Sequence, residues 1–246
     1  MRAVVKVKWR KDEDWRAVLR TATADGYREE ELPVGKKLDF EIGSKRRCTG
    51  HWVEQGEMKP CPGFREIDSG DQCSECRRKD YYRDYVTGRS GIETDDDFSV
   101  YLAQCGKAVK VGVARSSRLE KRWVEQGADH AAEISGGLSS QEALDRESEM
   151  SDRGFSERIA KEKKLGAADS VLGEKLDELG LEAETVDVQS LTAYPEISPR
   201  NVERAGRFSG ELRSVKGQIL SNGRMAIALT SGKVLQEPSQ AGLGDF

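Results

Sequence analysis

The chain has 246 residues, of which 34% are charged and 36% hydrophobic, and its formal net charge is −4. This composition is that of a globular protein and excludes a disordered chain, and the negative charge excludes a protein that is basic overall. No segment has the apolar core of a signal peptide or approaches the about 20 apolar residues of a membrane span. Because the five cysteines are an odd number, they favour a reducing compartment. We expect a cytoplasmic protein with no membrane partner.

The first elements in chain order are β-prone. Val4–Val7 is a short β-branched run, and a helix is predicted around Asp14–Leu19. Val34–Ile42 then alternates apolar and polar residues, which predicts a half-buried strand. This strand leads directly into the first cysteine.

Four cysteines follow within a short stretch: Cys48, Cys61, Cys73 and Cys76. The last two form a CxxC pair, and two thiolates from a separate turn would complete a tetrahedral zinc site. Four protein ligands leave no open position for water, so the predicted Zn²⁺ is structural. Two alternatives stay open. His51 forms a CxxH pair with Cys48 and could replace a cysteine, or the cysteines could be buried or redox-active thiols without metal.

Basic clusters lie on both sides of the cysteines. Lys45–Arg47 precedes them, Arg77–Lys79 follows them, and Tyr81, Tyr82 and Tyr85 come next. Basic residues interleaved with aromatic ones are typical of nucleic-acid-binding zinc proteins. The alternative is that these cations only offset the negative charge of a thiolate–zinc centre.

A polar stretch, Gly88–Asp97, predicts a boundary between two parts of the chain. Beyond it, two β-rich runs within Ser99–Ala114 flank a Cys-Gly-Lys turn and predict a β-hairpin. A capping box at Ser117 begins a helix that Gly127 ends. We expect Trp123 to pack on the hairpin.

Two helical side chains are candidates for a site. Packing of Trp123 carries its neighbour Arg122 to the edge of the packed face. A second capping box at Ser139 begins a helix on which Glu147 shares a face with Ala143, where a carboxylate is costly unless a cation or metal is nearby. The alternative is that Glu147 lies at the margin of that face, in water.

The remaining chain predicts helices over Gly154–Leu165 and Ala168–Leu179, and a hairpin of Glu211–Leu220 and Arg224–Thr230 joined by an Asn-Gly turn. Lys216 on this hairpin is expected to be solvated. The whole pattern predicts an α/β (α+β) fold in three parts. Residues 1–92 form a β-rich zinc-binding part, 93–166 a hairpin with helices, and 167–246 further helices and a β-hairpin.

The central part resembles the GIY-YIG nuclease superfamily. Ser99–Tyr101 (SVY) stands for GIY, Lys110–Gly112 (KVG) stands for YIG, and Arg122 and Glu147 match the family's arginine and metal-binding glutamate. The departures are a serine for the first glycine, a lysine for the second tyrosine and a shorter spacing between the two motifs.

This resemblance implies metal-dependent phosphodiester hydrolysis. Glu147 would hold one Mg²⁺, Tyr101 would orient or deprotonate the attacking water, and Arg122 would stabilise charge on the phosphorus. Lys110, in place of a tyrosine, would bind phosphate. Ser99–His130 carries six Lys/Arg against three Asp/Glu, which favours an anionic ligand. The alternative is a fold retained without catalysis.

Over a longer span, the cysteine cluster followed by VYLAQ, VKVGV, RWVEQGA and GELRSVKGQIL resembles the domain of unknown function 2797 family. This resemblance covers most of the chain and implies an architecture rather than an activity. Two functions are therefore expected: a zinc-containing nuclease-like enzyme acting on nucleic acid, or a non-catalytic, zinc-stabilised adaptor that binds nucleic acid or protein.

Overall fold

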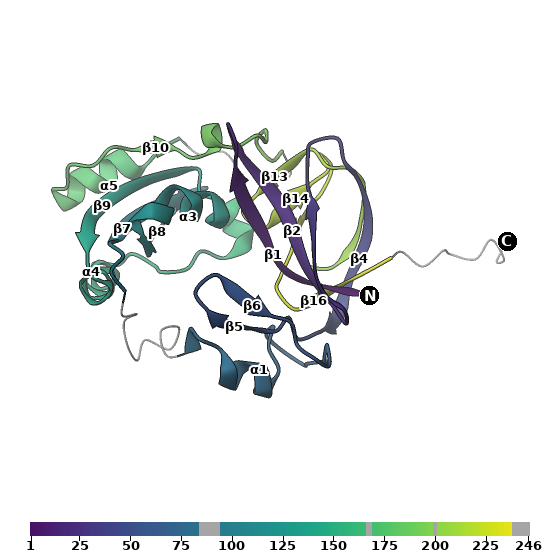
Figure 1. Cartoon of the computed structure of the whole chain (residues 1–246). Coiled ribbons are helices and arrows are strands. Elements are labelled where there is room, and N and C mark those ends of the chain that lie inside the picture. The colour runs from purple at the N-terminus through teal and green to yellow at the C-terminus, as the bar shows by residue number, and fades with distance from the viewer. Residues whose placement is uncertain (84–93, 166–168, 199–200, 238–246) are drawn as a thin grey trace, which may run out of the picture.

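The computed structural model describes residues 1–83, 94–165, 169–198 and 201–237. Its helices and mostly antiparallel sheets confirm a mixed α and β fold (Figure 1). Tyr85 and the predicted boundary between residues 92 and 93 lie outside the described residues. Among the described helices, none combines the length and the apolar character needed to cross a membrane.

The first sheet has six strands in the order β12-β4-β16-β1-β2-β3, all antiparallel to their neighbours. Its members are β1 (Arg2–Lys11), β2 (Trp15–Thr23), β3 (Gly26–Glu31), β4 (Lys37–Arg46), β12 (Gly206–Glu211) and β16 (Lys233–Gln236). The last strand, β16, lies between β4 and β1 and pairs with both. The N-terminal sheet is thus completed by strands from the far end of the chain.

Two predictions for this sheet have opposite outcomes. The predicted strand over Val34–Ile42 is confirmed as β4, with Leu38, Phe40 and Ile42 buried. The predicted helix over Asp14–Leu19 is wrong, because this segment forms β2, which pairs with β1 along its whole length. Pairing and burial against neighbouring strands outweigh the local preference of such a short segment.

The second sheet has the order β10-β9-β7-β8. Its members are β7 (Phe98–Cys105), β8 (Ala108–Arg115), β9 (His130–Leu138) and β10 (Val186–Asp187). The predicted hairpin is confirmed, since β7 and β8 pair from Phe98↔Arg115 to Cys105↔Ala108. Every residue of β7 is buried, so this strand forms the centre of the region.

Helices cover both sides of the second sheet (Figure 1). The helices of the described residues are α1 (Ser74–Lys79), α3 (Leu119–Gln126), α4 (Ser140–Asp152) and α5 (Leu172–Leu179), with 3₁₀ turns η1 (Ser116–Arg118), η2 (Lys161–Lys164) and η3 (Gln189–Leu191). The α3 helix lies against β1, β8 and η1, while α4 and α5 pack on Phe98, Val100 and Leu102.

The capping box at Ser139 is confirmed, with the hydroxyl accepting from the Glu142 N–H at 3.3 Å. The predicted helix over Gly154–Leu165 is wrong except at its end, where the 3₁₀ turn η2 forms. Residues 153–160 instead run along β8, with a bridge between Lys110 and Ser156. The predicted helix over Ala168–Leu179 is shorter and forms α5.

Two small sheets complete the fold. They comprise the β5–β6 hairpin (β5, His51–Glu54; β6, Glu57–Lys59) and a third sheet of β11 (Val202–Glu203), β15 (Ala226–Ala228), β14 (Ile219–Ser221) and β13 (Ser214–Lys216). The predicted Asn-Gly turn joins β14 to β15, whereas the predicted strand over Glu211–Leu220 is interrupted at Gly217.

The expectation that Lys216 is solvated is wrong. Its side chain is 5% exposed and pairs with Asp129 at 2.5 Å, so it is buried rather than solvated. Asp129 also accepts the Gly106 N–H at 2.6 Å. This ion pair joins the third sheet to the turn of the β7–β8 hairpin. The division at residues 92 and 166 stays a prediction, and the first and second sheets contain strands from both sides of it.

Candidate metal centre and central polar site

Four buried thiols converge at the base of the first sheet. The Sγ atoms of Cys48, Cys61, Cys73 and Cys76 all lie within 4.8 Å of one another. Cys48 follows β4, Cys61 follows β6, and the remaining pair brackets the first turn of α1. The cysteine centre, as we call these four residues, therefore ties three elements together.

The donor set fits a metal ion such as zinc. Four thiolates at this separation form a closed tetrahedral site, and the Cys73 N–H donates to Cys48 Sγ at 3.2 Å. His51 lies outside the four-thiol group found among the described residues. Its Nδ1 is buried without a hydrogen-bond partner there. The four cysteines are thus a complete ligand set without the histidine.

The thiols differ in their tendency to ionise. Burial raises the pKa of Cys48 to about 11. Burial also opposes ionisation of Cys73, but the N–H of Cys76 and the neighbouring thiols outweigh it and lower the pKa of Cys73 to about 7. Without a cation, these buried thiols cannot all hold negative charge. A divalent ion supplies the charge that would allow it.

Backbone geometry brings the cysteine loops close together. Gly50 has φ of +98°, and a Cβ at this position would lie 2.0 Å from the Lys59 carbonyl oxygen. Only glycine fits there, because both the conformation and the close approach exclude a side chain. Phe64 also has a positive φ of 40°, and its N–H donates to the Cys61 carbonyl at 3.0 Å.

The central site is our name for Tyr101, Lys110, Arg122 and Glu147. Tyr101 lies on β7 opposite Gly112 of β8. A Cβ on Gly112 would be 2.5 Å from the Tyr101 hydroxyl, so the tyrosine ring occupies the space above this glycine. Tyr101 is 0% exposed, and its burial raises the pKa of the hydroxyl to about 12.

Helix α3 supplies the groups around this hydroxyl. The Gln126 side-chain amide donates to it, and the charge of Arg122 acts on it in the direction that lowers its pKa. Trp123 is 7% exposed, as predicted, and meets the Tyr101 ring edge-on at 6.5 Å between centroids. Arg122 itself is 50% exposed, with Glu125 at 3.9 Å.

Lys110 and Glu147 share the electrostatic environment of Arg122. Burial and, to a lesser extent, the charge of Arg122 lower the pKa of Lys110 to about 8, against the opposing charge of Glu147. Burial and the charge of Glu157 raise the pKa of Glu147, against Lys110 and Arg122. Arg122 and Glu147 therefore act electrostatically on both Tyr101 and Lys110.

Two residues at this site, Glu157 and Lys164, were not predicted from the sequence. Glu157 is the carboxylate that most affects Glu147, and its carbonyl accepts from Lys110 Nζ at 2.6 Å. Lys164 donates to the Gln126 carbonyl. Glu157 lies in the irregular segment along β8 that was predicted as helix, where residue spacing carries no information about side-chain direction.

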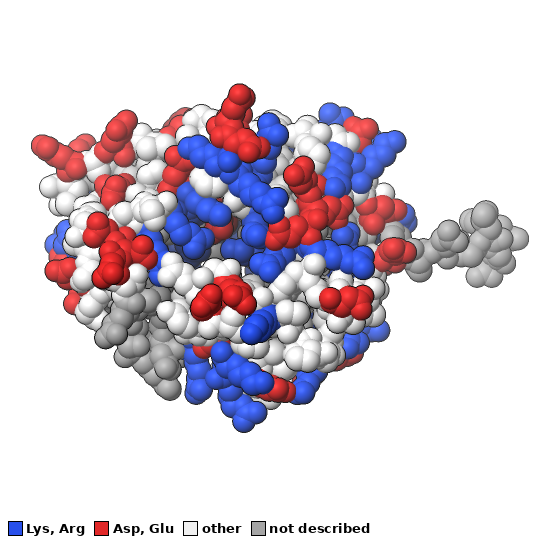
Figure 2. Space-filling view, in the orientation of Figure 1, with Lys and Arg blue, Asp and Glu red and all other residues white. Residues whose placement is uncertain are grey.

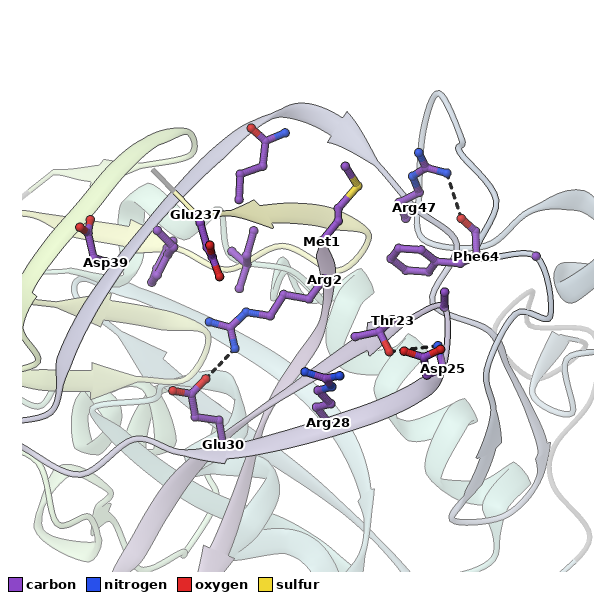
Figure 3. Close-up of a pocket in the computed structure, with 15 residues that line it drawn as sticks. Met1, Arg2, Thr23, Asp25, Arg28, Glu30, Asp39, Arg47, Phe64 and Glu237 are labelled. Carbon is purple, nitrogen blue, oxygen red and sulfur yellow. Dashed lines mark hydrogen bonds and ion pairs between the residues drawn. The ribbon is translucent and has the colours of Figure 1, made fainter. Parts of the chain in front are cut away.

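A large cavity lies elsewhere, at the end of the first sheet nearest the cysteine centre (Figure 3). It has a volume of about 1030 Å³, and none of the predicted site residues lines it. Its charged side chains have both signs, and Arg2 already pairs with Glu30 at 2.6 Å. Because its charges are mixed and partly paired, the cavity does not indicate one class of ligand.

Comparison with known proteins gives one result. Neither the curated proteins nor the solved structures contain a significant match. The family model described as "Protein of unknown function (DUF2797)" matches residues 35–230, which include all four cysteines and the whole second sheet. The chain therefore belongs to the DUF2797 family.

Proposed function

We propose that the central site hydrolyses phosphodiester bonds in nucleic acid with the help of a divalent metal ion, and that the cysteine centre binds a structural zinc ion. The supporting observation is that Arg122 and Glu147 both act electrostatically on Lys110 and on the enclosed Tyr101. It agrees with the resemblance of this region to the GIY-YIG nuclease superfamily.

Two cations have distinct roles in this proposal. Arg122 is half exposed, and its guanidinium is available to stabilise negative charge that develops on the phosphate oxygens. Lys110 has a pKa near 8, so a substantial fraction is neutral at mildly alkaline pH and able to accept a proton from water. Lys110 then takes the part that a tyrosine has in the nuclease superfamily.

Tyr101 is a positioning residue in this proposal. Because its side chain has no exposed surface, it cannot touch substrate, and it acts instead through the helix α3 groups that contact its hydroxyl. Gln126 and Arg122 are the groups concerned.

Glu147 fits a hard divalent cation such as Mg²⁺. Its carboxylate is partly buried, and its pKa is raised by burial and by Glu157, a penalty that a bound cation would relieve. When bound, such an ion would polarise a phosphate oxygen. Glu147 would hold it, and Glu157 is a second carboxylate whose charge acts on Glu147.

A second candidate function is non-catalytic binding of nucleic acid. Complete burial of Tyr101 and the replacement of a tyrosine by Lys110 favour it. The same cations would then bind phosphate without activating water.

Cleavage assays distinguish the two functions. The purified protein is incubated with labelled single-stranded, duplex and branched DNA and RNA, with Mg²⁺ or Mn²⁺. We expect metal-dependent cleavage that Glu147→Gln reduces at least about 100-fold, comparable with the loss of one oxyanion-stabilising group. The matched control is Glu149→Gln, an exposed glutamate on the same helix, which should cleave normally. Binding of these substrates without cleavage would overturn hydrolysis and leave the second candidate.

A further inference from the structure

An aromatic cluster lies next to the cysteine centre. Trp52 of β5 meets Tyr82 edge-on at 5.7 Å between ring centroids, and Tyr82 meets Tyr81 in the same way at 5.0 Å. Tyr81 is 48% exposed and is one of only three exposed large hydrophobic side chains among the described residues. An exposed ring supported by two others is available to stack on a ligand.

This cluster is held by the elements that the cysteines join. Asp80, at the end of α1, accepts the Trp52 N–H at 3.1 Å and the Tyr82 N–H at 3.0 Å. The Tyr81 N–H donates to the Trp52 carbonyl at 2.9 Å. Because β5 and α1 are fastened at their other ends by the cysteine centre, the ring positions depend on it.

Tyr82 also lines a pocket to which three arginines contribute. The arginine pocket has a volume of about 260 Å³ and lies between Tyr82, the end of β8 and the start of α3. Its lining comprises Tyr82, Phe98, Val113, Ala114, Arg115, Arg118, Arg122 and Glu125. Arg122 belongs to both this pocket and the central site, so the two are continuous.

The arginines of the pocket are not all neutralised. Arg115 pairs with Asp96 at 3.0 Å and lies over the Phe98 ring. Arg118, in contrast, has neither an ion pair nor a side-chain hydrogen bond within the described parts of the chain. Burial lowers the pKa of Lys6, Glu125 opposes this, and the charges of Arg118 and Arg122 lower it further.

Positive charge also extends beyond the pocket. Figure 2 shows Lys and Arg side chains gathered over α3 and the adjoining β1. The surplus is local, because the chain as a whole has a net charge of −4. A surface of this kind attracts a polyanion.

Aromatic rings beside Arg118, unpaired among the described residues, and the half-exposed Arg122 suit one type of polyanion. Duplex nucleic acid presents phosphates but keeps its base faces stacked inside, whereas a single strand presents both. We propose that a single strand of nucleic acid binds across this surface, with a base on Tyr81 and Tyr82 and phosphates on Arg118 and Arg122. This inference deepens the proposed function. It rests on that function in one respect only, that Arg122 would lead the bound strand to the central site.

Fluorescence anisotropy with labelled 12-nucleotide single strands of DNA and RNA tests the proposal, using the Glu147→Gln protein without Mg²⁺ so that no cleavage occurs. We expect Tyr82→Ala to weaken binding about 5- to 150-fold, as for the loss of one base–aromatic stack, and Tyr82→Phe to bind normally because it keeps the ring. Arg118→Gln should reduce the slope of log K against log salt by about 0.7. Arg224→Gln, an exposed arginine at the β14–β15 turn, is the control that should leave the slope unchanged.

The competitors decide the class of ligand. A duplex of the same sequence and heparin, a polyanion without bases, should compete at least about 10-fold less well than the unlabelled single strand. Equal competition by duplex or heparin, or unchanged affinity in Tyr82→Ala and Arg118→Gln, would overturn the proposal whether or not the wild-type protein cleaves. Ring-dependent single-strand binding by a protein that never cleaves would support it and remove hydrolysis.

Discussion

The cysteine centre and the central site differ in how uniform and how exposed their side chains are. In the cysteine centre, four identical donors are all buried and face one point, so no position remains for a substrate. In the central site, four different groups range from the enclosed Tyr101 to the half-exposed Arg122. A closed set of equal ligands stabilises structure, whereas an open set with graded exposure and shifted pKa values is suited to chemistry.

The largest expected effect comes from breaking the closed set. Cys73→Ser should reduce bound zinc from near-equimolar to background and expose residues 47–83 to protease, because metal binding supplies the folding free energy of this segment. Metal analysis and limited proteolysis with mass spectrometry measure both effects. Cys105→Ser is the matched control, since Cys105 is buried at the end of β7 and outside the centre. Equimolar zinc in Cys73→Ser would contradict the assignment.

The buried ion pair between Lys216 and Asp129 stabilises the central region, as the cysteine centre stabilises the N-terminal region. Lys216→Ala leaves Asp129 buried without its cation, and we expect a loss of about 3–5 kcal/mol in the free energy of unfolding. Chemical denaturation measures it. The double variant Lys216→Met with Asp129→Asn should recover part of the loss, because no unpaired charge remains. Equal stability of Lys216→Ala and wild type would show that water reaches the pair.

A smaller effect is expected where Tyr101 covers a glycine. Gly112→Ala places a methyl group 2.5 Å from the Tyr101 hydroxyl, so the ring must move, at a cost of about 1–3 kcal/mol. Gly43→Ala on β4 has no neighbour within 4 Å of the added carbon and should change stability little. If both variants unfold at the wild-type denaturant concentration, the Tyr101 ring does not occupy the position described.

The smallest expected effect concerns the protonation of two lysines, one of which belongs to the central site. Two lysines have a pKa lowered to about 8, Lys110 and Lys161, both chiefly through burial. For each lysine, the pKa in the folded state lies below the pKa in the unfolded state. The lysine therefore disfavours folding at low pH, and its contribution to the free energy of unfolding becomes more favourable as pH rises from about 8 to about 10.5. NMR titration of ¹³C-methylated lysines should show two lysine resonances that titrate with midpoints near pH 8. Lys110→Gln should remove one and Lys161→Gln the other, and loss of neither would contradict the assignment.

Sequence reasoning located what depends on spacing and local pattern. The CxxC pair with two upstream cysteines identified the cysteine centre, and the alternation before Cys48 identified β4. The β-rich runs on either side of Cys105 identified the hairpin on which Tyr101 lies.

Long-range contacts account for what was missed. Asp14–Leu19 became strand because β1 and β3 lie on both sides of it, and nothing local indicates that. Glu157 reaches the central site only because an irregular segment returns along β8. Lys216 has its partner Asp129 in a distant turn, so its burial leaves no pattern in its own strand.

The position of β16 has a consequence for synthesis of the chain. Its residues, Lys233–Gln236, separate β1 from β4, so neither strand has its full set of neighbours until ribosomes have translated almost all of the described sequence. The cysteines and the β7–β8 hairpin emerge long before and need only local partners. If the cysteine centre binds a metal ion, the ion can bind to a nascent chain whose first sheet is still open. During that interval, the exposed edges of β1 and β4 are the surfaces most open to chaperones or to aggregation.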